Sequence, residues 1–537
     1  MKRLYQELRN SRAFMTGLGC FLVLLTLSSS AFAQSRRVQG QITDANGVPL
    51  FGVTVFEKGT TNNGAISAED GSYTITVASS ESVLLITSIG FVNQEVTVGN
   101  RNTINIMLEE DMTMLEEVVV VGYGTEKKVN LSGAVDQVNA EQLEKRPISN
   151  VTEGLQGVVP NLNIMNNSGA PGSNSNINIR GITSINGGDP LILIDGVPSS
   201  TAELNRIAPQ DVETISIIKD ASAAAIYGAR AAFGVVLITT KNGEGKVKVN
   251  YTGYVSFNRP TVTPNKVTDP YIYSRLLETS TDNTPWDNVN YNDQYYDYAK
   301  QRSEDPSVPG VRINPSDESL WEYMGDRDWT NYFLKDNTVS NNHQISVSGG
   351  QENVNYLLSA SYSRQNGVLR LAEDYFDRYT VRSKINFKPT NWLTVGNNTY
   401  LTTTERKEPS QLSLGAIYDV FPTSWNINPD GTWANSGAGR IGAQLTDGGE
   451  SITEYSSLQS QFTTKIDFIK NKLSWNNDFT FRRGRQDWNW YRTKYQIGYG
   501  PGDVREEGDN RAYRSNAIDN YYVFNSYLNF NQMVGSR

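Results

Sequence analysis

The stretch RYTVRSKINFK, residues 378–388, decides how this chain folds. Its odd-numbered positions carry Tyr379, Val381, Ile385 and Phe387, with one serine among them, whereas its even-numbered positions carry threonine, arginine, lysine and asparagine. Side chains alternate between the two faces of a β-strand, so this period of two predicts a strand with one apolar and one polar face.

The same alternation recurs through residues 246–537, a region that we interpret as part of a transmembrane β-barrel. The connections between its strands are alternately long and short, which is typical of barrels with short periplasmic turns and long external loops. A soluble β-sandwich also alternates, but its loops seldom reach such lengths on one side only. Aromatic residues near strand ends, such as Trp392, Tyr400 and Trp475, are predicted to form interfacial girdles. Strands are predicted near 247–258, 342–349, 354–364, 378–388, 391–404, 456–468, 472–484 and 519–530.

Residues 125–245 have a mixed α/β character. A short helix is predicted over 149–157, capped by Ser149 or Asn150. The buried strand that starts at Pro190 runs into a tight turn, and an alanine-rich helix is predicted over 221–227. Too few helices alternate with strands for a doubly wound enzyme.

Two β-rich segments precede this region. Residues 34–110 contain short strands separated by turn signals, a pattern that predicts an Ig-like sandwich of about seven strands. Residues 111–124 form a connector that contains a valine run flanked by Glu116, Glu117 and a Gly-Tyr-Gly. Such a connector strand can add to the sheet of another protein, although it can equally be a buried strand of a flanking domain.

The first 33 residues have the pattern of a cleaved secretory signal. A basic segment is followed by the apolar run 21–27 and by the small-residue site Ala31-Phe32-Ala33. Cys20 is the only cysteine and lies within this signal, so we expect the exported chain to fold without disulfides. After residue 33 no apolar run approaches the roughly 20 residues of a membrane helix.

The composition argues against several classes of function. A net charge of −9 and the lack of a basic cluster argue against nucleic-acid binding. His343 is the only histidine, so a Ser-His-Asp triad would depend on it, and no zinc site of Cys/His type is available. We predict no catalytic residue, metal or cofactor. A carboxylate-only hydrolase, such as a secreted glycosidase on a β-sandwich, remains an alternative.

Five stretches of residues 125–245 are specific enough to compare with known families: SGAPG (168–172), IRGI (179–182), DPLILIDGVP (189–198), KDASAAAIYGAR (219–230) and GVVLITTK (234–241). In this order they resemble the SusC/RagA family of TonB-linked outer-membrane transporters. Residues 36–109 resemble its carboxypeptidase-regulatory-like domain, a non-catalytic module. The resemblance implies that 125–245 is a plug and that 246–537 is the first part of a barrel of about 22 strands.

The resemblance also implies a mechanism and partners. The TonB box would be Glu117, Val118, Val119, Val120 and Val121, on which periplasmic TonB pulls to open the plug. A glycan or peptide would be imported with the help of a SusD-like surface lipoprotein, and the wall would contact outer-membrane lipid of a Gram-negative cell. A non-transporting receptor or adhesin with the same architecture is the alternative.

Several plug residues have predicted roles. Arg180, next to Gly181, either pairs with a carboxylate of the plug or wall or is an exposed strand end. Asp195 and Gly196, followed by Pro198, are predicted to form a structural turn, and Asp220 to cap the following helix. Tyr227, Gly228 and Arg230 are a candidate contact that locks the plug to the barrel.

Two expectations concern the barrel itself. The aromatic run Trp488-Asn489-Trp490-Tyr491 could stack on sugar rings, and an interfacial anchor is the favoured interpretation. Eight strands fill their lumen with side chains and cannot enclose a plug. We therefore expect this chain to be the N-terminal portion of a longer transporter.

Overall fold

The computed structural model describes residues 35–45, 47–60, 63–88, 91–109, 118–121, 124–127, 135–144, 146–166, 168–181, 188–220, 224–412, 414–470 and 472–532. The chain forms two compact units. One ends at Val118 and also includes Lys127–Asn130, and the other comprises Val119–Glu126 and Leu131–Arg537. The predicted signal of residues 1–33 lies outside the described residues.

The N-terminal unit is the predicted β-sandwich. One sheet has the order β4-β1-β7 and the other β3-β2-β5-β6. Alternate residues of β4 are buried, so each strand contributes one face to a core built around Ile42, Leu84 and Ile86. The strands are β1 Arg36–Thr43, β2 Thr54–Glu57, β3 Gly64–Ile66, β4 Ser72–Val77, β5 Val83–Thr87, β6 Gln94–Thr97 and β7 Ile106–Met107.

Glu57, at the end of β2, is a buried carboxylate inside this sandwich and is 5% exposed. Its oxygens accept hydrogen bonds from Asn63 Nδ2 at 2.6 Å, Ser82 Oγ at 2.5 Å and the Ala78 amide at 3.1 Å. Burial alone would raise the pKa of Glu57, but these three hydrogen bonds outweigh it and lower the pKa below its ordinary value. The carboxylate therefore joins three separate segments of the sandwich.

The connector contains a two-stranded sheet. Its strands are β8 (Val118–Val121) and β9 (Gly124–Lys127), and β8 pairs with no other strand of the described chain. Glu117, the first residue of the predicted TonB box, lies outside the described residues.

The plug is built on a five-stranded sheet with the order β10-β15-β16-β13-β14. Its strands pair antiparallel except β13 with β16. A second sheet pairs β11 (Leu162–Asn166) with β12 (Ser175–Ile179). The main sheet contains β10 Val135–Asn139, β13 Leu191–Ile194, β14 Val197–Ser199, β15 Val212–Ile218 and β16 Val235–Thr240; the helices are α2 Ala140–Glu144, α3 Val151–Leu155, α4 Thr201–Arg206, η2 Pro209–Asp211 and η3 Ala225–Ala231.

Two helices of the plug refine the sequence predictions. Asn150, not Ser149, caps α3, because its side chain accepts the Glu153 amide at 2.8 Å. The helix predicted over 221–227 lies partly outside the described residues: Ala224 is α-helical, and a 3₁₀ helix, η3, follows from Ala225 to Ala231 and is broken at Gly228, where φ is 68°. Residues 221–223 are not described, so the cap at Asp220 stays a prediction.

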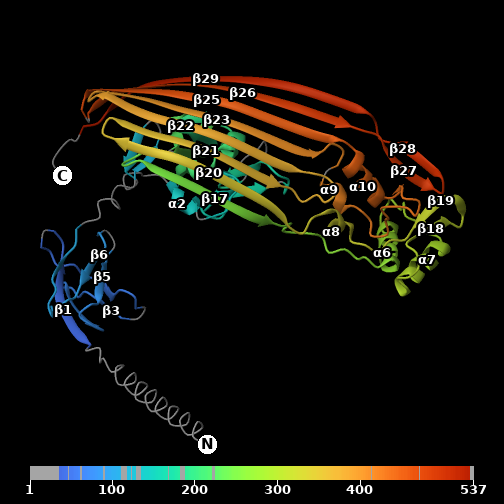
Figure 1. Ribbon diagram of the computed structural model, residues 1–537, viewed down its shortest axis with the longest axis horizontal. Helices are drawn as coiled ribbons and strands as arrows, with labels where there is room; N and C mark the ends of the chain where they lie inside the picture. The colour runs from blue at the N-terminus through green and yellow to red at the C-terminus, as the bar shows by residue number, and fades with distance from the viewer. Residues whose placement is uncertain are drawn as a thin grey trace, which may run out of the picture. The chain divides into compact units, whose positions relative to one another are not determined.

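Residues beyond the plug form one antiparallel sheet of eight strands, which we call the wall. All eight predicted strands are confirmed, but several extend further toward the long connections. β26, for example, continues to Arg492, where the prediction ended at 484. Figure 1 shows the plug lying along one face of the wall. The strands, in sheet order, are β17 Lys248–Asn258, β20 Thr338–Gln351, β21 Val354–Asn366, β22 Tyr375–Thr390, β23 Leu393–Pro409, β25 Glu450–Ile469, β26 Leu473–Arg492 and β29 Arg511–Phe530.

The long connections are folded and pack together at one end of the wall (Figure 1). An apolar cluster that includes Trp329, Phe333, Ile417 and Ile441 joins the first long connection to the connection after β23. These segments contain α6 Pro270–Asp282, α7 Asp293–Glu304, β18 Val311–Asn314, β19 Asp317–Tyr323, α8 Trp329–Phe333, α9 Leu414–Tyr418, β24 Trp433–Ala434, α10 Gly437–Asp447, β27 Tyr495–Gly500 and β28 Asp503–Glu507.

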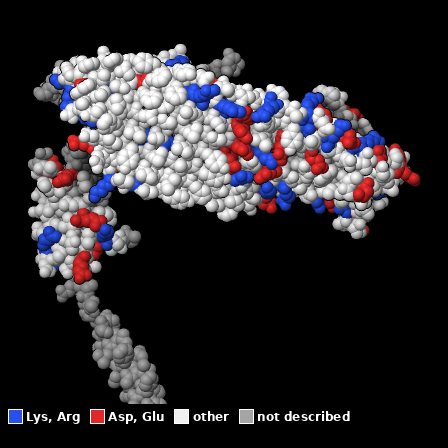
Figure 2. All heavy atoms as spheres, turned by 45° about the horizontal axis from the view of Figure 1, so that its top comes forward, with Lys and Arg blue, Asp and Glu red and all other residues white. Residues whose placement is uncertain are grey.

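The face of the wall that points away from the plug is divided along the strands. Toward the short turns it presents exposed apolar side chains such as Ile385, Phe462 and Phe524, and toward the long connections it becomes charged. Figure 2 shows this change as an uncharged region that gives way to lysine, arginine and carboxylate side chains. A strand of about 10 residues crosses a bilayer, so the 20-residue strands extend well beyond it. Within the described residues, no helix has both the length and the apolar character to cross a membrane.

We predict that the sandwich loses stability in acid because of Glu57. A carboxylate whose folded pKa is lowered stabilises the fold above its unfolded pKa, near 4.5, and this contribution is lost as the pH falls through the folded pKa. Urea unfolding of the isolated domain of residues 34–110, measured between pH 7 and pH 3, should show the loss. Glu57→Gln should lower stability at pH 7 by about 1–3 kcal/mol and flatten the pH dependence, since it leaves buried donors without a charged acceptor. An unchanged pH profile in Glu57→Gln would contradict this assignment.

Candidate functional site

The turn between β13 and β14 positions a carboxylate at the contact between plug and wall. Asp195 and Gly196 form its two central residues, with φ values of 48° and 83°. An Asp-Gly pair is favoured in two-residue hairpin turns that need positive φ at both positions, so the predicted turn is present. The Asp195 carboxylate accepts the Thr240 amide at 3.0 Å and the Thr240 hydroxyl at 2.6 Å, which fixes it against β16.

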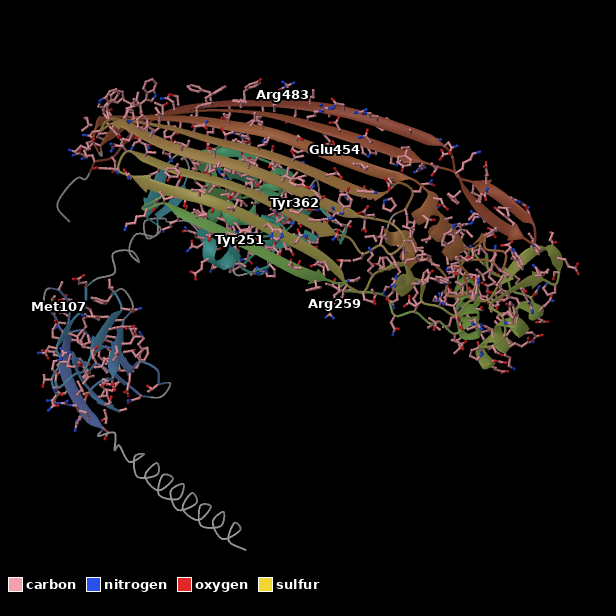
Figure 3. All side chains as sticks on the ribbon, viewed as in Figure 1. Met107, Tyr251, Arg259, Tyr362, Glu454 and Arg483 are labelled. Atoms are coloured by element: carbon pink, nitrogen blue, oxygen red, sulfur yellow. The ribbon has the colours of Figure 1, made fainter. Side chains whose placement is uncertain are left out.

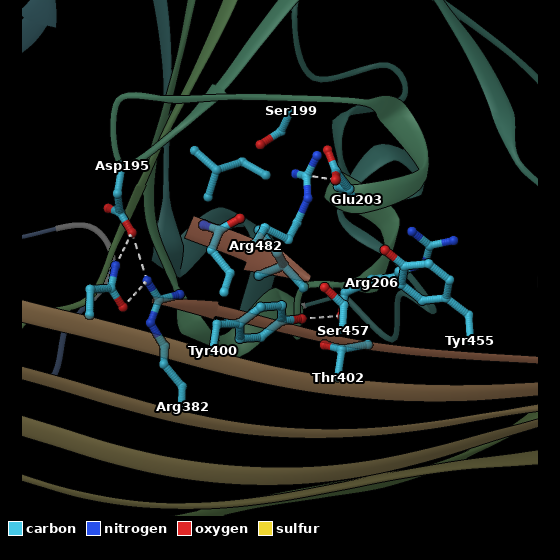
Figure 4. Close-up of a pocket in the computed structure, with 14 residues that line it drawn as sticks. Asp195, Ser199, Glu203, Arg206, Arg382, Tyr400, Thr402, Tyr455, Ser457 and Arg482 are labelled. Carbon is cyan, nitrogen blue, oxygen red and sulfur yellow. Dashed lines mark hydrogen bonds and ion pairs between the residues drawn. The ribbon is translucent and has the colours of Figure 1, made fainter. Parts of the chain in front are cut away.

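The wall supplies three further donors to the same carboxylate, and Figure 4 shows Arg382 at Asp195. Arg382 Nη2 lies 2.6 Å and Asn398 Nδ2 2.9 Å from Asp195 Oδ2, and Lys384 Nζ lies 3.5 Å from Oδ1. We call the Asp195 carboxylate and its four partners the Asp195 clamp. The Asp195 side chain is 11% exposed and that of Arg382 is 2% exposed. Burial would raise the pKa of Asp195, but Lys384 and Arg382 overcome it and hold the pKa well below its usual range.

A second contact lies around α4. Ser200 and Glu203 form a reciprocal capping box at its start. At its end, Arg378 of β22 donates to the Asn205 carbonyl at 2.7 Å and to the Ser149 carbonyl at 3.1 Å. Arg378 is only 1% exposed, so the wall inserts a cation that binds unpaired backbone carbonyls instead of a carboxylate.

Other wall side chains donate to the plug in the same way. Arg482 of β26 forms an ion pair with Glu203, and Gln344 of β20 donates to Asp211 at 2.6 Å. The hydroxyl of Tyr400 donates to the Arg206 carbonyl, so the prediction that Tyr400 belongs to an interfacial girdle is wrong. Its even position places it on the inner face with Arg382, whereas the neighbouring Leu401 faces outward and is 44% exposed.

Comparison with known proteins identifies the two parts of the chain. The CarboxypepD_reg-like domain family matches residues 38–120, and the TonB-dependent Receptor Plug Domain family matches residues 127–235. TonB-dependent receptor P26 of Formosa agariphila is 34% identical over 395 residues, which are 72% of this chain and 36% of that receptor. TonB-dependent receptor SusC of Bacteroides thetaiotaomicron is 33% identical over 373 residues, 68% of this chain and 33% of SusC.

The chain belongs to the SusC/RagA type of TonB-dependent receptors. It spans about a third of the length of these two curated relatives. A solved structure of the RagAB peptide importer in its open-open state shares the fold, with a TM-score of 0.53 and 20% identity over 77% of this chain and 55% of that one. These relatives are receptors or transporters, not enzymes, and they imply an outer-membrane β-barrel.

The other predicted plug residues of this receptor chain lie apart from the Asp195 clamp. Arg180 is exposed with φ at 63°, and it forms no ion pair with the described residues. Gly181 also has a positive φ, of 88°. Pro198 lies opposite Leu193 in β14, at the edge of the plug sheet, where a missing amide donor is tolerated.

Tyr227 and Arg230 line a cavity between the plug and the wall, and their role as a lock between plug and barrel stays a prediction. The cavity has a volume of about 620 Å³ and lies between η3 of the plug and the inner faces of β25, β26 and β29. Arg230 is exposed and has no ion pair within the described part of the chain, and Gly228 lies at the break in η3 between them. Ion-paired contacts between plug and wall lie at Asp195, where the sequence predicted only a turn, and at Glu203. The signal for the Asp195 contact in the sequence was the pair of cations, Arg382 and Lys384, on the polar face of 378–388.

The aromatic run near the end of β26 faces inward, so the favoured interfacial-anchor interpretation is wrong for its two tryptophans. Trp488 and Trp490 share the parity of Arg482, which contacts the plug. Both line a cavity of about 410 Å³ between the wall and plug residues 168–171. The indole of Trp488 also lies edge-on to Tyr513, with ring centroids 5.1 Å apart. No group of His, Asp and Glu among the described residues is arranged to hold a metal.

We predict that Asp195→Asn loosens the plug from the wall. The substitution leaves two buried cations without a carboxylate, and breaking a buried pair in this way costs about 3–5 kcal/mol. Because Cys20 is the only cysteine, a fluorophore on a cysteine introduced at the exposed Asn163 of β11 would report on plug unfolding in urea.

Asp189→Asn is the matched control, since Asp189 is exposed and lies in the same domain. It should leave the urea midpoint unchanged. Adding Arg382→Met and Lys384→Met to Asp195→Asn should restore part of the lost stability, because no buried charge then remains unpaired. Equal midpoints for Asp195→Asn and Asp189→Asn would show that the clamp does not hold the plug.

Proposed function

We propose that this chain forms the sandwich, the plug and the first part of the barrel of an importer that takes up a bulky nutrient, a glycan or a peptide, across the outer membrane. The observation that carries the proposal is the plug itself, a folded domain with its own core that rests on the wall through separate polar contacts. Such contacts can yield and re-form without breaking the core of either part. The related RagAB complex is described as a peptide importer, and this supports a large cargo.

Energy must reach the plug from the periplasm, because an outer membrane holds no ATP. We propose that TonB pairs with the TonB box, residues 117–121, by strand addition, which depends on backbone hydrogen bonds and tolerates a plain valine run. The two-stranded sheet of β8 and β9 supports this, since one edge of β8 is unpaired within the described sheets.

The order of the plug sheet determines what a pull from the box would do. β10, the first plug strand after the box, lies at one edge and pairs only with β15. The Asp195 clamp is near the opposite edge, at the turn between β13 and β14. Tension would therefore peel β10 away first, while the clamp holds the rest of the sheet on the wall. We propose that the plug opens by partial unfolding from this edge.

Cargo would enter from the end of the wall where the long connections pack. The cavity lined by Trp488 and Trp490 lies beside the plug segment 168–171. Indole faces suit sugar rings and apolar side chains alike. A SusD-like lipoprotein is the partner that the family implies outside the cell, and we propose that it covers this end.

The wall requires further strands. Both β17 and β29 are edges of the described sheet, and a lipid-exposed edge would leave backbone groups unpaired in the membrane. Eight strands are also too few to close around a plug. We propose that the complete receptor supplies the remaining strands of a barrel with about 22 in all.

We predict that Val120→Pro abolishes uptake while leaving surface amounts unchanged. Proline removes a ladder hydrogen bond and cannot pair within a strand, whereas Val120→Ile keeps the strand and should transport normally. Uptake would be measured in cells that carry the complete receptor, on the glycans or peptides that support growth. Normal uptake by Val120→Pro would favour the alternative of a non-transporting receptor or adhesin.

A second prediction concerns closure of the barrel. The chain of 537 residues, expressed alone, should fail to give the compact heat-modifiable form that closed barrels show in gel electrophoresis. The complete receptor with its further strands should give that form. A heat-modifiable form of this chain alone would contradict the proposed closure.

A further inference from the structure

The outward face of the wall contains one charged residue that its surroundings do not explain. Across the sheet, the register aligns Arg483 of β26 with outward-facing neighbours on the other strands. The row that it completes is otherwise uncharged and consists of Tyr251, Ile345, Ala360, Val381, Leu401, Leu458 and Asn520.

From this row to the short turns, the outward positions of the eight strands carry no other charged side chain. Arg483 is exposed, and its guanidinium forms no hydrogen bond or ion pair with the described residues. Figure 3 shows Arg483 on its strand at the outer surface of the wall. An unpaired cation at the margin of an apolar surface is costly in a bilayer unless something neutralises it.

The residues next to Arg483 on the long-connection side are also basic. Arg485 lies two positions further along β26 and forms a bidentate pair with Asp487, at 2.7 and 3.0 Å. Asp487 also accepts Asn516 Nδ2 at 2.5 Å, and Arg514 of β29 lies on the same outward face. Asp487 and Glu454 thus face Arg485 and Arg514, whereas Arg483 has no carboxylate partner among the described residues. Glu454 faces outward directly opposite Asp487, so it lies nearer the long connections than Arg483 does.

Below Arg483, toward the short turns, the outward side chains suit lipid tails. Tyr522 is 67% and Phe524 65% exposed on β29, and Phe479 is 41% exposed on β26. In the same register row as Arg485, Tyr362 and Tyr379 stack with ring centroids 4.9 Å apart. Tyrosines of this kind mark the boundary between lipid tails and head groups. Arg483 therefore lies at that boundary, on the side of the long external connections.

We propose that Arg483, assisted by Arg485, binds the phosphate of a lipid head group in the outer leaflet. This inference rests on the proposed function, which places the wall in an outer membrane. An arginine fork donates two parallel hydrogen bonds to phosphate, and the apolar residues below it accommodate the acyl chains of the same molecule. The lipid is thus held at both ends, by charge at the head and by contact area along its tails.

The test compares lipid retained by the receptor after purification from outer membranes in mild detergent. Phosphate-bearing lipid A per receptor would be quantified by mass spectrometry for the wild type, Arg483→Gln and Arg505→Gln. Arg505 is an exposed arginine of β28, outside the wall, paired with Asp503, so it is a matched control. We expect at least a fivefold loss in Arg483→Gln, a smaller loss in Arg483→Lys and none in Arg505→Gln. Equal retention in all variants, or equal loss in both glutamine variants, would overturn the proposal.

A second measurement identifies the source of the phosphate. Purified receptor would be mixed with phosphatidylcholine vesicles that contain either phosphorylated or dephosphorylated lipid A. Binding should require the phosphorylated form and resist competition by inorganic phosphate. Displacement by inorganic phosphate would overturn a lipid site. Nutrient uptake, measured in parallel, should be normal in Arg483→Gln, whereas a wild-type receptor absent from the outer membrane would overturn both this inference and the proposed function.

Discussion

The structure depends on a register of backbone hydrogen bonds that runs through eight strands from β17 to β29 and shifts only beside two of the short turns. Side chains alternate strictly along each strand, so a slip of one residue would exchange the two faces. The same strand must serve lipid on one side and the plug on the other. In β22 this means that Val381 faces outward while Arg382 reaches Asp195, although the two are neighbours in sequence.

Hydrogen-bond donors and acceptors are distributed unequally between the two surfaces. At most of its contacts the wall supplies the donor, from arginine, lysine, amide or hydroxyl groups, and the plug supplies a carboxylate or a backbone carbonyl. Arg378 is the clearest case, since it binds two carbonyls of the plug and no carboxylate. Backbone carbonyls are present whatever the sequence. Much of this interface therefore restricts the amino-acid sequence of the wall more than that of the plug.

The sequence was sufficient to predict the sandwich, the eight strands and the turn at Asp195, because these follow from local periodicity and turn chemistry. It was insufficient for contacts between residues of different segments. The inward orientation of Tyr400 and Trp488 depends on register, and a register is fixed only when the neighbouring strands are known. The strand ends near the long connections were missed for a related reason. There the alternation of apolar and polar residues stops, but the strands remain paired through backbone hydrogen bonds.

Arg382 and Lys384 lie on the same face of one strand and share a single carboxylate. If the turn that carries Asp195 left its place, two like charges would face each other with nothing between them. Their repulsion raises the energy of an unplugged wall, and the return of Asp195 relieves it. The contact that resists removal of the plug from the wall therefore also favours its return.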